Sequence, residues 1–148
     1  MGLSFFFKIS DMKTGSLQIS AWSVTYDSYS FALTIRFGQL VTEVEVYADR
    51  KTWQQFGKEL QTFPHSPTHS VTLRIDREAE IVLTAICYDE EGHAALRVLV
   101  ADDRVQPGPY RLEFAIPVDI AGLNDLGNKL VAWPQNEYEN LYWDAYKS

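Results

Sequence analysis

The chain has 148 residues, of which 46% are hydrophobic and 22% charged, so it is long enough to bury the core of one globular domain. This composition excludes a disordered chain and a fibrous protein. No apolar run approaches the roughly 18 residues needed to span a bilayer, and the apolar patch in MGLSFFFKIS is too short for a secretory signal. The single cysteine, Cys87, cannot form an internal disulfide. We therefore expect a cytoplasmic protein that contacts no membrane.

The net charge of -7 arises entirely in the second half of the chain. Residues 1–70 carry six basic and six acidic side chains, whereas residues 71–148 carry seven basic and fourteen acidic ones. Because carboxylates repel phosphate, we expect no nucleic-acid partner. The acidic residues indicate either a solvated edge that favours solubility or a surface for a basic protein. On such a surface we expect Asp89, Glu90, Glu91, Asp102 and Asp103.

Alternation of apolar and polar residues predicts strands in the first half of the chain, at residues 3–9, 17–21, 31–37 and 44–46. A helix is predicted next, because Asp49 can cap its N-terminus and Pro64 ends it. Spacings of three and four place its apolar side chains on one face: Trp53, Phe56, Leu60 and Phe63.

The second half of the chain repeats this order of elements. Strands are predicted at residues 71–76, 80–88, 93–101 and 109–117, and a helix at 119–133. The strand at 80–88 is apolar on both faces, which is typical of a central strand.

A gapless match between residues 38–64 and 108–134, at an offset of 70, indicates an internal repeat. Six of the 27 aligned positions are identical, namely the pairs Gly38 and Gly108, Glu43 and Glu113, Asp49 and Asp119, Gly57 and Gly127, Leu60 and Leu130, and Pro64 and Pro134. A glycine inside a helix costs about 1 kcal/mol relative to alanine. Its presence at the same place in both helices therefore predicts close approach of each helix to a strand or to its twin.

These patterns predict one α+β domain over residues 1–148. It consists of two pseudo-symmetric units, about residues 1–70 and 71–134, each an antiparallel four-stranded meander with a helix. The two sheets either stack as a sandwich or continue as one curved sheet.

The tail, residues 135–148, is rich in aromatic residues. Asn136 can cap a short helix with Glu139 at its third position. Aromatic side chains with acids beside them suit protein recognition, so we expect partner contacts from Glu137, Glu139, Tyr142 and Trp143. Tyr138, Tyr142 and Tyr146 follow at intervals of four, as on one face of a helix, and Leu141 joins them in an apolar stripe. This stripe either binds a toxin, joins two copies of the chain as a homodimer, or folds back over its own sheet.

Catalytic signatures are missing from the sequence: it contains no G-x-S-x-G, no phosphate-binding glycine loop, no H-E-x-x-H and no paired cysteines. We therefore predict a protein that is not an enzyme and that holds no metal or cofactor. The alternative is a small-ligand or enzymatic domain with a cavity between the two halves, lined by residues such as Trp22, Tyr47 and Tyr110.

Three segments carry a resemblance to a known family. They are W-x-x-F-x-K-E-L at residues 53–60, R-L-E-F-A-I-P-V-D at 111–119, and L-x-x-L-x-x-x-L at 123–130. Together with the order of elements, they resemble the small bacterial immunity proteins of the WapI type and related uncharacterised domains. The resemblance implies a cytoplasmic protein that binds and neutralises a cognate toxin domain without catalysis. It carries over no functional residue.

Overall fold

Each half of the chain forms three antiparallel strands, a helix and one further strand, in that order. The computed structural model describes residues 15–23 and 29–145. The first half comprises β1 (Gly15–Ser23), β2 (Tyr29–Phe37), β3 (Leu40–Ala48), α2 (Arg50–Gln61) and β4 (Val71–Ile75). The second comprises β5 (Glu80–Cys87), β6 (Ala94–Asp102), β7 (Tyr110–Val118), α3 (Ile120–Ala132) and β8 (Leu141–Asp144). The strand predicted at residues 3–9 lies outside the described residues.

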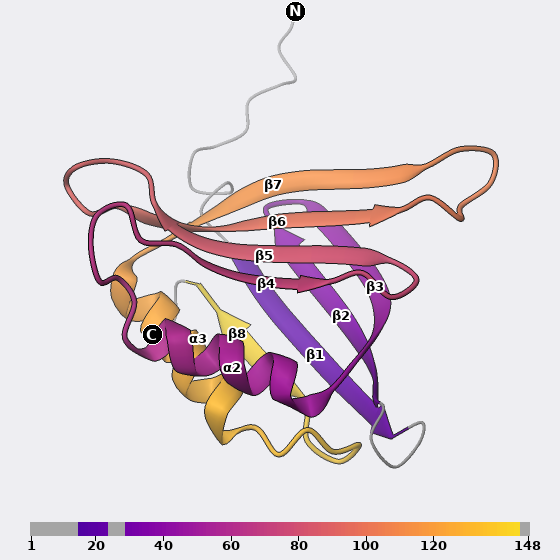
Figure 1. The fold of residues 1–148 in the computed structure, drawn as a ribbon. Coiled ribbons are helices and arrows are strands. Elements are labelled where there is room, and N and C mark those ends of the chain that lie inside the picture. The colour runs from indigo at the N-terminus through magenta and orange to yellow at the C-terminus, as the bar shows by residue number, and fades with distance from the viewer. Residues whose placement is uncertain (1–14, 24–28, 146–148) are drawn as a thin grey trace, which may run out of the picture.

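The strands form two antiparallel four-stranded sheets (Figure 1), sheet A with the order β3-β2-β1-β8 and sheet B with the order β4-β5-β6-β7. The predicted α+β fold is confirmed. The composition of sheet A differs from the prediction, because its fourth described strand is β8 from the tail. The strand that follows each helix is thus exchanged: β4 follows α2 but completes sheet B, and β8 follows α3 but completes sheet A.

Equivalent elements of the two halves differ in residue number by a constant, and this constant changes at one hairpin loop. The offset is 70 between β3 and β7, which begin at Leu40 and Tyr110, and between α2 and α3. It is 65 between β2 and β6, which begin at Tyr29 and Ala94. The difference of five arises because residues 103–109 connect β6 to β7, whereas only residues 38–39 connect β2 to β3. The second half therefore contains a five-residue insertion in one hairpin loop.

The two helices cross at the repeated glycines. A Cβ atom on Gly57 would lie 3.0 Å from the carbonyl oxygen of Gly127, and a Cβ atom on Gly127 would lie 2.7 Å from that of Gly57. Each glycine thus allows close approach of its helix to the twin helix. The matched pair Gly38 and Gly108 is not equivalent in this way, because Gly38 forms a tight turn with φ of 59° while Gly108 lies in the longer loop.

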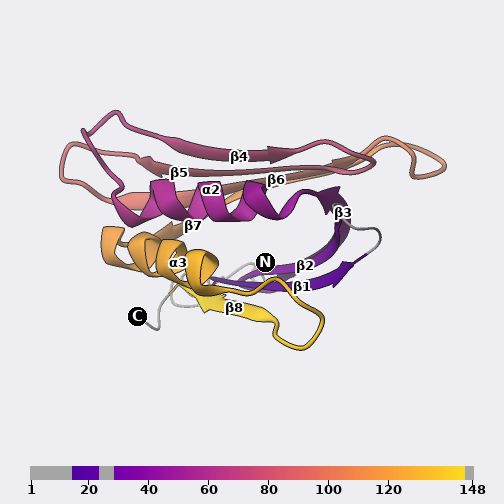
Figure 2. The same ribbon diagram turned by 60° about the horizontal axis from the view of Figure 1, so that its bottom comes forward.

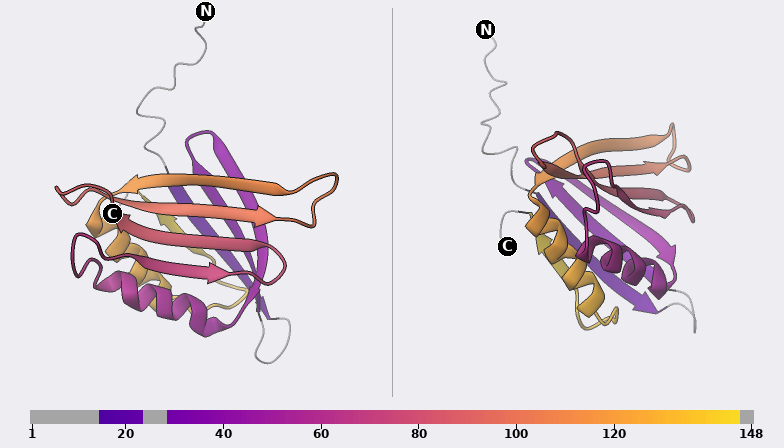
Figure 3. Two further views of the ribbon diagram at one scale, coloured as in Figure 1. Left: turned by 45° about the horizontal axis from the view of Figure 1, so that its top comes forward. Right: turned by 60° about the vertical axis from the view of Figure 1, so that its left-hand side comes forward.

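The core lies between the two sheets and the helix pair. The strands of the two sheets run at a steep angle to each other (Figure 3), and the helices lie side by side at one end (Figure 2), with α2 along β4 and α3 along β8. At the centre, the ring of Phe31 lies 5.7 Å from that of Trp53 and 6.0 Å from that of Trp133. Burial of such side chains, at about 1.5–3 kcal/mol each, is the main stabilising term.

The tail forms a strand, so the predicted C-terminal helix is wrong. The Asn136 side chain accepts hydrogen bonds from the backbone N–H groups of Tyr138 and Glu139, both at 3.0 Å, as a cap would. The chain nevertheless makes only a turn there and then pairs with β1, with Trp143 opposite Leu17. Antiparallel pairing buries alternate residues, and it outweighs the helical spacing of the tyrosines. Among the described residues, no helix has the length and apolar character needed to span a membrane.

Candidate functional site

An open groove of about 520 Å³ lies where β3, the edge strand of sheet A, meets one end of sheet B. This volume is in the range of about 300–1,000 Å³ that is usual for ligand sites. We call it the β3 groove and define it by its lining residues: Val41, Thr42, Glu43, Val44, Glu45, Glu78, Ala79, Val100, Asp102, Arg104, Val105 and Tyr110.

The two sheets are fixed to each other at the base of this groove. The hydroxyl groups of Thr42 on β3 and Tyr110 on β7 are hydrogen-bonded at 2.8 Å, and Thr42 is buried. Nearby, the rings of Phe37 and Phe114 stack with their centroids 5.6 Å apart. These contacts join sheet A to sheet B, so the β3 groove is formed by the scaffold itself.

The charge of the groove is strongly negative. Its lining residues include four acids, Glu43, Glu45, Glu78 and Asp102, and one base, Arg104. The guanidinium of Arg104 donates to Asp102 at 2.8 Å and to Glu78 at 2.9 Å. Its hydrogen bonds hold the pKa of the Asp102 carboxyl below its ordinary value. Arg104 is paired with two groove carboxylates, and the other two, Glu43 and Glu45, have no basic partner among the described residues, although Glu45 accepts a hydrogen bond from the Ser30 hydroxyl at 2.9 Å.

Apolar side chains surround the same groove. Val41 is 48% exposed, Val105 43% and Tyr110 39%, and the neighbouring Leu40 is 48% exposed. They make up half of the eight large hydrophobic side chains that the described residues expose. A cluster of exposed apolar residues beside charges is typical of a protein interaction site.

The backbone of β3 is open along the groove. One edge of β3 pairs with β2 along the whole strand. On its other edge, the part of the chain that the structure describes supplies one isolated antiparallel bridge, between Val46 and Glu78. Residues 40–45 therefore present unpaired backbone groups on that side, and such an edge is a template for another strand.

The acidic residues expected on one surface lie at two ends of sheet B. Asp89, Glu90 and Glu91 lie in the turn before β6, and Asp102 and Asp103 lie at its end. A strand of nine residues separates the two groups by roughly 30 Å. The prediction of a single acidic surface is therefore wrong, and only Asp102 of these residues lines the β3 groove.

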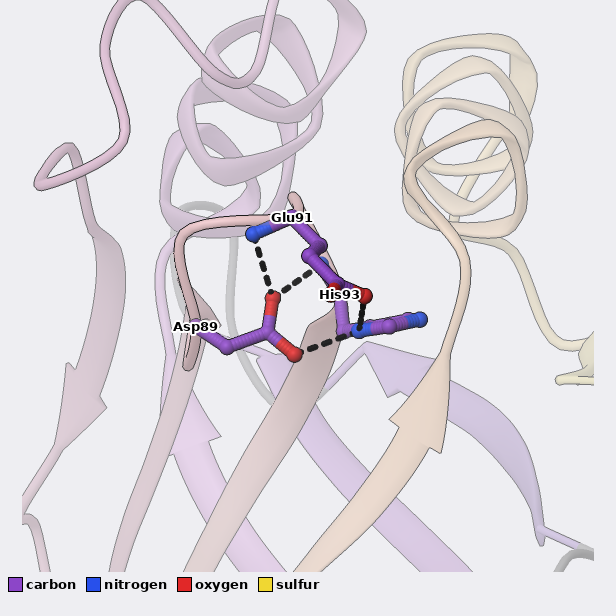
Figure 4. Close-up of side chains that lie close together, drawn as sticks. All are labelled: Asp89, Glu91 and His93. Atoms are coloured by element: carbon purple, nitrogen blue, oxygen red, sulfur yellow. Dashed lines mark hydrogen bonds and ion pairs between the residues drawn. The ribbon is translucent and has the colours of Figure 1, made fainter.

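The turn before β6 is closed by a local network (Figure 4). The Asp89 carboxylate accepts from the backbone N–H groups of Glu91 at 2.9 Å and His93 at 3.0 Å, and it also pairs with the His93 ring. This pairing lowers the pKa of Asp89 and raises that of His93. Ligand atoms of Asp89, Glu91 and His93 lie within 4.8 Å of one another, a spacing that a metal ion could use. The hydrogen bonds of Asp89 already explain the arrangement as a turn.

The candidate residues of the tail have different environments. Trp143 is buried and donates its indole N–H to the Gly122 carbonyl oxygen at 3.0 Å, so its assignment to a partner surface is wrong. Tyr142, on the outer face of sheet A, is 54% exposed. Glu137 and Glu139 are exposed in the α3–β8 connection and are not among the residues that line the β3 groove.

A second cavity, of about 380 Å³, lies between the start of α2 and the loop after α3. Arg50 lies 5.4 Å above the ring of Tyr29 and donates to the Pro134 carbonyl oxygen. The buried side chain of Gln135 donates to the Arg50 carbonyl oxygen at 2.9 Å, and its own oxygen has no partner among the described residues. These bonds attach the tail to the first turn of α2.

The three aromatic residues expected around one cavity do not meet. Tyr110 lines the β3 groove, while Tyr47 lies beside a shallow pocket near the start of α2. Trp22 is opposite Ser30 on the outer face of sheet A and is 46% exposed.

Composition did not point to Glu43 and Glu45 because the first half of the chain is neutral overall. Their position on an edge strand is the signal that distinguishes them.

Comparison with known proteins leaves the family open. The chain matches no protein-family model, and no curated protein is significantly similar to it in sequence.

Proposed function

We propose that this chain is a non-catalytic protein-binding module that captures a basic partner in the β3 groove. The proposal rests on one observation: carboxylates, exposed apolar side chains and an open strand edge occur together in a groove of about 520 Å³. We further propose that the partner is a bacterial toxin domain, which the chain neutralises in the cytoplasm. The resemblance to WapI-type immunity proteins supports this finer role.

Charge complementarity gives the groove a physical role in this function. An acidic site attracts a basic partner over several ångströms and raises the association rate, while apolar contacts slow dissociation. Val41, Val105 and Tyr110 supply such apolar contacts at the rim. A toxin that acts on nucleic acid has a basic active site, so an acidic inhibitor can cover it without performing any chemistry.

A second candidate function is the binding of a small ligand in the cavity beside Gln135. Two features favour it: the carboxamide oxygen of Gln135, for which residues 15–23 and 29–145 supply no hydrogen-bond partner, and the cation of Arg50. The bonds of both residues to the tail and to α2 give them a structural role as well.

Self-association through the tail is a further mode of protein binding that we propose to test. Leu141 and Trp143 are buried within their own domain, so Tyr138 and Tyr142 would make the contact. Sedimentation of the full chain and of the variant Tyr138→Ser, Tyr142→Ser measures it. A dimer that becomes a monomer in the variant supports this mode.

The immunity role is tested by co-expression in a bacterial host. The candidate toxin for this test is the variable C-terminal domain of a large secreted protein, provided that the gene directly upstream of this chain's gene encodes one. We expect the chain to restore growth and to purify with the toxin as a complex. The variant Glu43→Lys should lose this protection, whereas Glu59→Lys on the exposed face of α2 is the matched control. Growth arrest that the unaltered chain fails to relieve would contradict the immunity role.

A further inference from the structure

The β3 groove has the chemistry of a site for an added strand. We propose that the basic partner binds there through an extended segment, which pairs with the free edge of β3 as a fifth strand of sheet A and alternates basic with apolar residues. This inference rests on the proposed protein-binding function and specifies its mode of recognition. Strand addition takes affinity from backbone hydrogen bonds and specificity from alternate side chains.

The first argument is the geometry of the edge. The isolated bridge between Val46 and Glu78 shows that the outer edge of β3 can take an antiparallel backbone partner, although Glu78 itself is left-handed, with φ of 67°, and belongs to no strand. Glu78 lies in the linker between the two halves. Beyond this bridge, residues 40–45 of β3 lie along the groove. An incoming strand would extend the pairing from the Glu78 end of β3 toward Leu40.

The second argument is the chemistry on the two faces of β3. Glu43 and Glu45 lie on the outer face and point away from the core, on the same side as Val41. Side chains of an added strand alternate between the same two faces. Basic residues on one face would meet Glu43 and Glu45, while apolar residues on the other would meet the groove wall formed by Val105 and Tyr110.

The other edge strands of the two sheets differ from β3 in charge: β4 carries one base, Arg74, and β8 carries one acid, Asp144. β7 carries Arg111 and Glu113, whose side chains pair at 3.5 Å. Its charges therefore balance, and they offer a basic segment no net attraction. β3 has two acids and no base over its whole length, so charge complementarity selects β3 as the edge that a basic strand would join.

The test uses the full chain and a blocked seven-residue peptide of alternating lysine and valine. Amide hydrogen exchange is measured with and without the peptide, together with its affinity by calorimetry. The peptide begins and ends with lysine, and two isomers of it, N-methylated on two valines or on the two internal lysines, have the same composition and the same charge. Because an added strand uses alternate backbone groups, we expect one isomer to bind at least about tenfold more weakly than the other. Alternate amides of residues 40–45 should exchange more slowly, and those of β7 should not change.

Three results would overturn strand addition. They are equal affinities of the two isomers, peptide binding without slower exchange in β3, and amides at 40–45 that are already protected in the free chain. The last result would mean that a segment of the chain itself or a second copy occupies the edge. If any of them occurs while the chain still relieves toxin arrest and Glu43→Lys abolishes that relief, the proposed function stands and only this mode of binding fails.

Discussion

The two halves of the chain have the same scaffold but different connections. Three strands and a helix recur, with the helices crossing at Gly57 and Gly127. The hairpin loop of the second half has seven residues where that of the first half has two. The longer loop supplies Arg104 and Val105 to the β3 groove, and the linker between the halves supplies Glu78.

Positions that repeat in the two halves pack the core, whereas segments that differ between the halves form the candidate binding site. The identical positions that are buried, such as Gly57, Gly127, Leu60 and Leu130, all serve the contact between the helices. The groove instead forms where the second half departs from the first. Symmetry therefore accounts for the core, and the departure from symmetry accounts for the candidate site.

The largest loss of stability is expected when a buried side chain is truncated on one of the exchanged strands, β4 or β8. Trp143 on β8 is buried, so Trp143→Ala should lower the free energy of unfolding by about 3–5 kcal/mol. Leu73→Ala on β4 should cost about 2–5 kcal/mol by the same loss of buried contacts. Denaturant unfolding measures both, with the exposed Tyr142→Ala as a control that should cost under about 1 kcal/mol. A mild effect in β8 beside a severe one in β4 would break the equivalence of the exchanged strands.

The next largest loss of stability is expected when a glycine at the crossing of α2 and α3 is replaced by alanine. A Cβ atom on Gly127 would lie 2.7 Å from the Gly57 carbonyl oxygen and 2.8 Å from the backbone nitrogen of Gln61. Gly127→Ala should therefore destabilise the fold by about 1–3 kcal/mol, even though alanine favours a helix by about 1 kcal/mol. Gly57→Ala should behave alike. Gly108→Ala meets no atom within 4 Å and should leave the melting temperature unchanged. Equal melting temperatures of all three variants would contradict the close crossing.

Two charge reversals distinguish the two ends of sheet B. Glu43→Lys in the groove should slow association with the basic peptide by about tenfold at low salt, because it reverses the local field. Glu90→Lys makes the same charge change in the distant turn and should alter the rate by less than about twofold. Stopped-flow measurements at two ionic strengths test the pair. Equal slowing by both variants would show that only the net charge matters.

The smallest effect on stability should come from removing the hydrogen bond between Asp89 and His93. The pKa of His93 is raised above its ordinary value of 6.5 by its hydrogen bond with Asp89. The stabilisation by this pair is thus complete below that value and is lost as the pH rises through the folded pKa. An NMR titration should show the raised pKa and its return toward 6.5 in Asp89→Asn. An unchanged titration in that variant would mean that Asp89 does not cause the shift.

Much of the fold follows from local patterns. Alternation predicted β1, β2 and β3, and the repeated order of apolar segments between turns predicted β4 to β7. Asp49 and Asp119 lie at the N-cap positions of α2 and α3 as expected, but the Asp119 side chain accepts a capping hydrogen bond, from the Gly122 N–H group, whereas that of Asp49 makes none. The offset of 70 predicted close approach of each helix to a strand or to its twin, and the structure shows that the partner is the twin. The tail could not be predicted this way, because spacings of four favour a helix while the neighbouring edge of β1 favours a strand. Which of them prevails depends on a partner more than a hundred residues away in sequence.

The candidate site was less accessible to sequence reasoning. Counting charges placed the interface in the second half and grouped residues that lie at opposite ends of β6. Glu43 and Glu45 come from the neutral half, and only the packing of the two sheets brings them to Asp102. The exposed edge of β3 depends on the order of the strands, which local periodicity does not specify.

The most direct test of this account is to restore the symmetry of the two hairpins. Residues 103–109 are replaced by Gly-Gln, the connection found at residues 38–39. This change removes Asp103 and Arg104, so the net charge stays at -7 while Glu78 and Asp102 in the groove lose their basic partner. Weaker binding would therefore come from the loss of the groove wall that includes Val105, and not from a loss of negative charge. We expect a melting temperature within about 4 °C of the parent, because the strands keep their register, and at least about tenfold weaker binding of the alternating lysine-valine peptide. A folded variant that binds the peptide with the parent's affinity would contradict the claim that the insertion builds the binding site.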